Sequence, residues 1–424
     1  MGPNLETSAR HVIIVGAGPA GASLALLLVR RGIRVTLLEQ ETSFERVFRG
    51  EGLMPAGMDA LAQMGLGTLL HRIPHRRLES WNIHLGGEEV FVVPEPDLGD
   101  RSLSIVSQPA LLQGIVAEAA SHEGFEFKPG CQMQDLLWDN SRVVGTQVKT
   151  ENGSSEIRAD LVVGCDGRGS LVRRRAGLTI KLQPDQYDVL WFKLTAPERL
   201  QNTCQFYLMA KSQQHPASCY TSWDGRLQYG LILPKGGLGK LGDNDWLNLA
   251  ARSAPEWLRT HILAQRDAVT QPVRLNVVVG RCPQWSAPGV LLLGDAAHPM
   301  SPVRAQGINL ALRDAIVATN YLVPALQKDV AEVDEALQLI QMERLPEVTR
   351  SQTLQLREAN SLKLIRSAPW KLAVAQQILP FASRLRWVRQ AWLARQHDLR
   401  HGSQPVQLNL NGSPNPTRKQ SAQP

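Results

Sequence analysis

The sequence predicts an α/β fold in which a doubly wound sheet is interrupted by a second, mostly antiparallel sheet and is followed by helices. Near the start, an apolar run at residues 11–15, a helical segment at 22–31 and an apolar run at 33–38 make a βαβ unit of about thirty residues. Between residues 183 and 282, short apolar runs alternate with turn residues, as in an antiparallel sheet. Beyond Val330 the pattern is mainly helical.

A glycine-rich turn joins the first strand to the first helix. Gly16, Gly18 and Gly21 form a Gly-x-Gly-x-x-Gly run: the first permits a tight turn, the second lets the backbone approach a pyrophosphate, and the third allows close helix packing. The helix start around Ala20 offers amide groups to phosphate charge. Glu39, which ends the second strand, can accept hydrogen bonds from ribose hydroxyls. The order of strand, turn, helix and acid favours a Rossmann-like dinucleotide site over a plain glycine turn.

A second element follows the apolar run at residues 161–164. This run delivers Asp166 and Gly167 to the carboxyl end of a predicted strand, where open α/β sheets bind ligands. Asp-Gly pairs are also common at ordinary junctions between a strand and a turn. The residues alone leave both interpretations open. We further predict a helix at 109–120, and a hairpin in which strands 143–149 and 156–163 meet at a turn.

A third element begins after the apolar run at residues 290–293. Asp295, which follows Gly294, can bind a sugar-like hydroxyl. The helix that opens beyond Pro302 offers backbone donors and the positive end of its dipole, which suits a flavin ring that becomes negative on reduction. We expect His298 to belong to a packed turn, because two alanines precede it. The first residues of the helix that we place in this site are Gly307, Ile308 and Asn309.

Together, these elements resemble the class A flavoprotein monooxygenases, which share the p-hydroxybenzoate hydroxylase fold. The resemblance extends from about residue 10 to 325 and also includes Arg49 and Gln108. It implies that the glycine loop holds the ADP half of FAD, and that Arg49 and Gln108 contact its flavin side. It further implies that Asp166 serves FAD or NAD(P)H, that Asp295 lies on the ribityl chain, and that Pro302 lies beside the isoalloxazine. The implied cofactor-binding residues are Gly16, Gly18, Ala20, Gly21, Glu39, Arg49, Gln108, Asp166, Gly294, Asp295, Pro302, Gly307, Ile308 and Asn309.

The sequence departs from the family pattern just before the last helix of this region. Ala305 stands where the family usually has glycine, and Arg304 precedes it. An added methyl and a cation so near the flavin would alter ring mobility or substrate choice, and the sequence does not decide which. Pro302 and Arg304 are the flavin-adjacent candidates for a catalytic role. No catalytic base can be identified from sequence.

The resemblance also implies a reaction. NAD(P)H reduces FAD, oxygen adds at the flavin C(4a) carbon, and the resulting hydroperoxide hydroxylates an aromatic or other apolar small molecule. One alternative is a reductase or halogenase of the same fold, although the WxWxIP motif of flavin halogenases is absent. Another is a non-catalytic binding protein, against which the intact glycine loop, Glu39 and Asp295 argue.

The cysteine content indicates a cellular compartment, and the predicted elements indicate domain boundaries. The five scattered cysteines argue against a disulfide framework or a zinc site and suit the cytoplasm. The predicted FAD-binding domain comprises residues 8–75, 100–182 and 283–330, the substrate-binding sheet 76–99 and 183–282, the C-terminal helical region 331–401, and a disordered tail 402–424.

The net charge of +7 is concentrated near the C-terminus, since residues 343–401 hold eleven Arg or Lys against four Asp or Glu. No nucleic-acid-binding module is visible, so we expect no nucleic-acid partner. Residues 361–401 combine this basic character with Trp370, Trp387 and Trp392. The segment is interpreted either as a helical cap with solvated arginines or as a peripheral contact with an anionic membrane.

Overall fold

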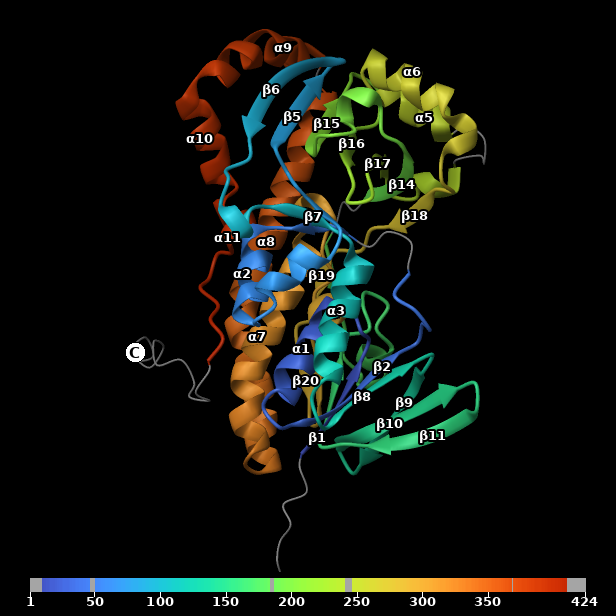
Figure 1. Ribbon diagram of the computed structural model, residues 1–424, viewed down its shortest axis with the longest axis vertical. Helices are drawn as coiled ribbons and strands as arrows, with labels where there is room; N and C mark the ends of the chain where they lie inside the picture. The colour runs from blue at the N-terminus through green and yellow to red at the C-terminus, as the bar shows by residue number, and fades with distance from the viewer. Residues whose placement is uncertain (1–9, 46–49, 184–186, 241–245, 368, 410–424) are drawn as a thin grey trace, which may run out of the picture.

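A six-stranded sheet in the order β20-β21-β12-β1-β2-β8 lies in the lower half of Figure 1. All of its neighbouring strands pair in parallel except β20 and β21. Its strands are β1 (His11–Val15), β2 (Arg34–Glu39), β8 (Phe125–Pro129), β12 (Leu161–Gly164), β20 (Ser286–Ala287) and β21 (Val290–Leu292). β1, β12 and β21 are fully buried, which explains their continuous apolar sequences. The computed structural model describes residues 10–45, 50–183, 187–240, 246–367 and 369–409.

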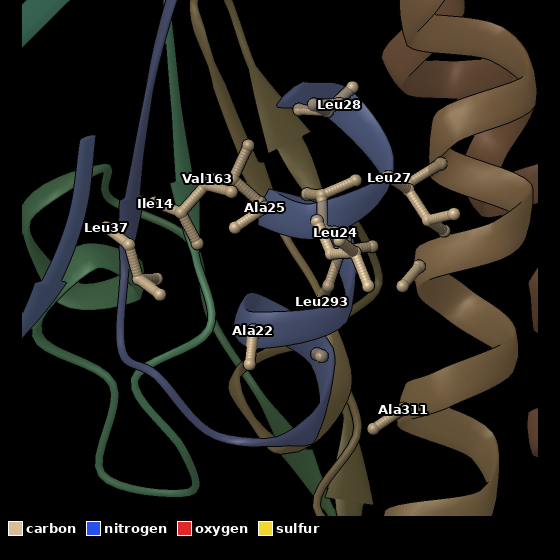
Figure 2. Close-up of a cluster of buried hydrophobic side chains, with 14 of the residues drawn as sticks. Ile14, Ala22, Leu24, Ala25, Leu27, Leu28, Leu37, Val163, Leu293 and Ala311 are labelled. Atoms are coloured by element: carbon tan, nitrogen blue, oxygen red, sulfur yellow. The ribbon is translucent and has the colours of Figure 1, made fainter. Parts of the chain in front are cut away.

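Helices α1 (Pro19–Val29) and α7 (Gln306–Leu326) stack on this sheet. Every residue of α1 from Ala20 to Val29 is buried, because α1 lies between the sheet and α7. In Figure 2, Ile14, Leu37 and Val163 of the sheet lie on one side of α1, and Ala311 of α7 lies on the other. The same core cluster includes residues of α2 (Pro55–Gln63) and α3 (Gln108–Ala120).

The predicted hairpin is formed, but its second strand was predicted too long. The hairpin strands β10 (Arg142–Thr150) and β11 (Gly153–Arg158) pair antiparallel, with β9 (Gln132–Asp139) on the other edge of β10. β11 ends because Asp160 turns the chain: its Oδ1 accepts a hydrogen bond from Arg10 and its Oδ2 accepts one from the His11 amide. The residues that follow become β12 of the parallel sheet.

A seven-stranded sheet, β18-β14-β17-β16-β15-β5-β6, lies in the upper half of Figure 1. It is antiparallel apart from the β15–β5 pair. Its strands are β5 (Ser80–Leu85), β6 (Glu88–Pro94), β14 (Tyr187–Thr195), β15 (Gln205–Ala210), β16 (Ala217–Thr221), β17 (Arg226–Pro234) and β18 (Val273–Asn276). Alternate side chains of β14 reach opposite faces: Leu190 and Phe192 pack in the cluster of α5 (Trp246–Ser253) and α6 (Glu256–Ala264), and Val189 packs on the other side.

Short elements connect these layers. They are β3 (Gly52–Leu53), β4 (His75–Arg77), β7 (Ser104–Val106), α4 (Leu171–Arg175), β13 (Lys181–Leu182) and β19 (Gly280–Arg281). The predicted fold class, an α/β cofactor domain with an inserted, mostly antiparallel sheet and C-terminal helices, is confirmed.

The C-terminal region consists of α8 (Val330–Ser367), α9 (Pro369–Arg384), α10 (Arg386–Arg395) and α11 (His397–His401). α9 lies over β5 and β6 at the top of Figure 1. A buried ion pair between Arg400 and Glu95 ties α11 to the end of β6. The prediction of disorder is wrong for residues 402–409, because Val406 is buried and Gln63 hydrogen-bonds to this segment. Residues 410–424 of the predicted tail lie outside the described residues.

Candidate active site

Of the three glycines in the loop after β1, Gly16 and Gly21 are closely packed, and Gly18 faces open space. Gly16 has φ of +100°, and a Cβ there would lie 2.5 Å from the carbonyl oxygen of Cys165. A Cβ on Gly21 would lie 2.0 Å from the carbonyl oxygen of Gly16. A Cβ on Gly18 would have no described heavy atom within 4 Å. Gly16 and Gly21 are therefore required by packing, and Gly18 leaves room for a ligand to approach the backbone.

A groove of about 500 Å³ runs from this loop along the carboxyl ends of the parallel strands. The predicted cofactor residues that line it are Gly16, Gly18, Ala20, Glu39, Gln108, Asp166, Gly294, Asp295, Gly307 and Ile308. Gly21 does not line the groove, and Arg49 lies outside the described residues. The three sequence elements, separated by more than a hundred residues each, are thus brought to one edge of the sheet.

Two acids in the groove, the buried Glu39 and the half-buried Asp166, have different partners. Glu39 accepts a hydrogen bond from the Ala17 amide at 3.0 Å through Oε2. Asp166 accepts the amides of Leu171 and Val172 through Oδ2, at 2.7 and 3.0 Å, and so caps α4. Burial raises the pKa of Asp166, only partly offset by hydrogen bonds at the start of α4.

The remaining oxygen of Asp166, Oδ1, is buried and has no hydrogen-bond partner among the described residues. A buried acceptor of this kind usually has a partner, so a ligand hydroxyl or amide in the groove would satisfy it. The open side of Gly18 and this free acceptor both fit a dinucleotide such as FAD.

A buried ionic network holds the turn that carries Gly294 and Asp295. Asp314 of α7 accepts the Gly294 amide at 3.2 Å and lies 2.8 Å from Nε2 of His298, and Arg344 of α8 donates to its other oxygen at 2.7 Å. His298 is 1% exposed and its ring lies 4.8 Å from that of Trp285, so it belongs to a packed turn.

The network continues through a second carboxylate. Arg344 pairs with Glu347, which also accepts a hydrogen bond from Arg313 at 3.2 Å. Burial opposes ionisation of Asp314, but the charges of His298 and Arg344 outweigh it and lower the pKa of Asp314 to about 2. Sequence reasoning missed this network; the only signal was an acid and a base spaced i, i+3 at residues 344 and 347.

A second cavity, of about 890 Å³, lies between the seven-stranded sheet and the C-terminal helices. Its walls are mainly apolar and include Leu78, Trp81, Leu85, Val189, Trp191, Phe206, Leu208, Tyr220, Ile232, Leu275, Pro302, Leu354 and Trp392. Five residues line both this cavity and the groove: Glu51, Arg168, Asp295, Gly307 and Ile308. The two spaces therefore adjoin at the start of α7.

Arg304 and Ala305 have an unusual backbone conformation at this junction. Both are left-handed, with φ of 57° and 49°. The Arg304 guanidinium lies 4.1 Å from the ring of Trp81 and 4.9 Å from that of Trp392, and Nε donates to Glu358 at 3.0 Å. Arg304 therefore joins the turn before α7 to the C-terminal helices and forms part of the wall of the second cavity.

The side chain of Asn309 makes its hydrogen bonds within the protein. Its Oδ1 accepts the Met54 amide at 2.8 Å, and its Nδ2 donates to the carbonyls of Gly52 and Ala305. It lines neither cavity. Its side-chain amide therefore fastens β3 and α2 to the start of α7, and the placement of Asn309 in the cofactor site stays a prediction. Pro302 lines the second cavity and not the groove.

A charged cluster that the sequence did not predict lies where the two spaces meet. Lys193 of β14 contacts Glu51 at 3.1 Å, Ser222 at 2.8 Å and Asp224 at 2.9 Å, and Ser222 donates to Glu51 at 2.7 Å. Burial raises the pKa of Glu51, and Lys193 and Ser222 offset only part of this effect. Nearby, burial raises the pKa of Tyr187 to about 12, so this phenol in the cavity wall remains neutral.

Comparison with known proteins agrees with this geometry. Residues 9–333 match the FAD binding domain family FAD_binding_3, and the chain belongs to it. The enzyme class predicted from the resemblance, an FAD-dependent monooxygenase, is confirmed.

Among relatives, the chain is 32% identical to 6-methylpretetramide 4-monooxygenase of Streptomyces rimosus, over 85% of this chain and 86% of that one. It is 27% identical to digeranylgeranylglycerophospholipid reductase 1 of Methanopyrus kandleri, over 75% and 81%. The crystal structure of p-nitrophenol 4-monooxygenase PnpA from Pseudomonas putida DLL-E4 superposes with a TM-score of 0.74 over 94% of this chain and 99% of that one, at 19% identity. This last likeness supports the fold.

Proposed function

We propose that this enzyme hydroxylates a large, electron-rich aromatic molecule, with NAD(P)H as electron donor and O2 as co-substrate. The observation that carries the proposal is the cavity of about 890 Å³, whose apolar wall meets the cofactor groove at the start of α7. That volume lies toward the upper end of small-molecule sites, which span roughly 300–1,000 Å³. The relative named for 6-methylpretetramide supports an aromatic substrate.

The residues of the groove would hold FAD, which supplies the redox and oxygen chemistry when bound. The amides at the start of α1, beyond Gly18, would meet the pyrophosphate. Glu39, Asp166 and Asp295 would take sugar or ribityl hydroxyls, and Asp166 Oδ1 offers a buried acceptor with no hydrogen-bond partner in the described part of the chain. The amides of Gly307 and Ile308, which line both spaces, would face the flavin ring.

Glu51 is the proposed base for the substrate. Its carboxylate faces both spaces, and its raised pKa brings it nearer to neutrality, where a general base is most effective. Removing a proton from a hydroxyl of an aromatic substrate makes the ring more electron-rich. Lys193 and Ser222 hold the carboxylate in position. The apolar wall excludes water and orients the ring.

The first test is the visible spectrum of the purified protein, repeated after anaerobic addition of NADPH or NADH. Flavin bands that bleach support the cofactor and its donor. A panel of one-ring to four-ring phenols is then screened for substrate-dependent NAD(P)H oxidation with matched oxygen uptake and a hydroxylated product. We expect the multi-ring compounds to have the higher kcat/KM.

Several results would contradict the proposal. A clear preference for one-ring phenols would show that the large cavity does not select the substrate. Saturation of an isoprenoid double bond without oxygen uptake would assign the enzyme to the reductase alternative, in line with the relative from Methanopyrus kandleri. A colourless protein that cannot be reconstituted with FAD would favour a non-catalytic role.

A further inference from the structure

Helix α9 has an apolar face on each side. On the inner side, Leu372, Ala375 and Leu379 pack with the side chains of β5 and β6. On the outer side, six large apolar side chains are between 47% and 68% exposed, and we call them the outer stripe: Trp370, Val374, Ile378, Phe381, Leu385 and Trp387. Half of the exposed large apolar side chains in the described residues belong to this stripe. Packing of the cap on the protein accounts for the inner face only.

The outer stripe is continuous along the helix. Residues 370, 374, 378 and 381 follow the spacing of one face of α9, and the stripe goes on with Leu385, between α9 and α10, and Trp387, in the first turn of α10. Isolated exposed apolar residues are normal on a soluble protein, but a contiguous apolar face usually marks an interaction site. In Figure 1, α9 lies at the end of the molecule opposite β9, β10 and β11, and the side chains of the stripe are exposed to solvent.

The charged residues of the segment that carries the stripe have one sign. Residues 369–395 contain no Asp or Glu. Lys371 Nζ lies 5.5 Å from the ring of Trp370, and the Arg384 guanidinium lies 5.8 Å from the ring of Phe381. The basic residues of α9 and α10 are Lys371, Arg384, Arg386, Arg389 and Arg395. A second copy of this chain would bring like charges together, whereas an anionic lipid surface complements both the charge and the apolar stripe.

We propose that the outer stripe binds the surface of an anionic bilayer. The apolar side chains enter the boundary between headgroups and acyl chains to a depth of roughly 5–10 Å, and the flanking cations contact lipid phosphates. No helix in the described part of the chain is long and apolar enough to cross a bilayer. Residues 370–395 thus combine the two roles that the sequence left as alternatives, a cap on the inner side and a lipid-binding surface on the outer side. This inference does not depend on the identity of the substrate.

The test is flotation of the full-length holoenzyme with vesicles. One set contains phosphatidylcholine alone, and the other contains about one third phosphatidylglycerol. We expect binding to the anionic vesicles that weakens in about 0.5 M salt, since salt screens exposed charges. The double variant Ile378→Glu, Phe381→Glu should lose at least roughly tenfold in vesicle binding. Trp138→Glu is the matched control, because Trp138 is 44% exposed on β9 at the other end of the molecule and should leave binding unchanged.

Retained FAD content and an unchanged Tm will show that the double variant is folded. A second variant, Arg384→Gln with Arg386→Gln, keeps the apolar stripe and should weaken binding to anionic vesicles roughly tenfold, without weakening binding to neutral ones. The proposal is overturned if the wild-type enzyme does not float with anionic vesicles, or if the Ile378 and Phe381 variant floats equally well. A wild-type dimer that the same variant converts to a monomer would also overturn it, by assigning the stripe to a second copy of the chain.

Discussion

The groove and the adjoining cavity are built in different ways. The groove is lined largely by backbone, small residues and the ends of strands: Gly16 follows β1, Glu39 ends β2 and Asp166 follows β12. The cavity is lined by large side chains that come from a sheet and from helices far apart in the sequence, such as Trp81 of β5 and Trp392 of α10. A binding site that is built from backbone requires particular residues at fixed spacings, and this pattern is visible in the sequence. A binding site that is built from side chains far apart in the sequence leaves almost no such pattern.

The largest expected effect separates the two roles of glycine in the groove. Gly16→Ala places a methyl 2.5 Å from the Cys165 carbonyl at φ of +100°, which should cost about 3 kcal/mol or more. We expect a protein that lacks FAD and unfolds at a much lower temperature. Gly18→Ala meets no described atom within 4 Å, so this matched variant should keep its Tm as an apoprotein and bind FAD more weakly. Equal loss of Tm in both variants would contradict this division. FAD content and thermal unfolding measure the difference.

The next effect concerns the support behind the groove. Arg344→Leu leaves the buried carboxylates Asp314 and Glu347 without their shared partner, which should cost about 3–5 kcal/mol of unfolding free energy. Because Asp314 also holds the Gly294 amide, FAD binding should weaken too. Arg350→Leu is the control, since its ion pair with Asp398 is partly exposed and should contribute about 1 kcal/mol or less. Urea unfolding measures both variants. If Arg344→Leu lowers the free energy of unfolding by less than about 1 kcal/mol, the buried network does not stabilise the fold as proposed.

The features that could be predicted from the sequence belong mainly to the groove, and those that could not depend on side chains brought together by the fold. The βαβ unit, the glycine loop and the turn at Asp295 were predictable because each is a contiguous run whose spacing reflects backbone geometry. The sequence places Asn309 beside Gly307 and Ile308, which line the groove, but only the packing of β3 against α7 shows where its side-chain amide points. Glu51 and Lys193 are 142 residues apart, so no local pattern predicts their contact. α5 and α6 were missed within a segment whose dominant signal was strands.

The third prediction tests whether Glu51 acts at the junction of the two spaces. Glu51→Gln should lower kcat/KM roughly a hundredfold at neutral pH and abolish the acidic limb of its pH profile, because the amide cannot accept the proton. Asp224→Asn is the control: Asp224 contacts Lys193 but lines neither cavity, so the limb should remain. An unchanged profile in Glu51→Gln would remove this residue from the proposed mechanism.

The same variant has a consequence for stability. Burial raises the pKa of Glu51 above its ordinary 4.5, so the folded state favours the protonated acid. Stability from this group is therefore present below pH 4.5 and is lost as the pH rises toward the folded-state pKa. Glu51→Gln removes this loss, and the free energy of unfolding should fall less over that interval than in the wild type. Urea unfolding at several pH values measures the slope. Parallel curves for the two proteins would show that Glu51 is not strained by burial.

The smallest effect lies at Ala305, where the two spaces meet and where the family usually has glycine. Its φ of 49° costs an L-residue roughly 1–2 kcal/mol, which glycine would avoid. Glycine also raises the conformational entropy of the unfolded chain, which lowers stability by about 0.4–1 kcal/mol. Ala305→Gly should therefore stabilise the protein by about 0.5–1 kcal/mol. The matched change Ala373→Gly, on the exposed side of α9, should instead destabilise it by about 1 kcal/mol. If both variants lose stability alike, Ala305 is not left-handed in solution. Ala305→Gly could also gain stability and lose turnover of the large substrate. That result would show that the strained turn shapes the second cavity, by holding Arg304 against Trp81 and Trp392, and does not serve the cofactor groove.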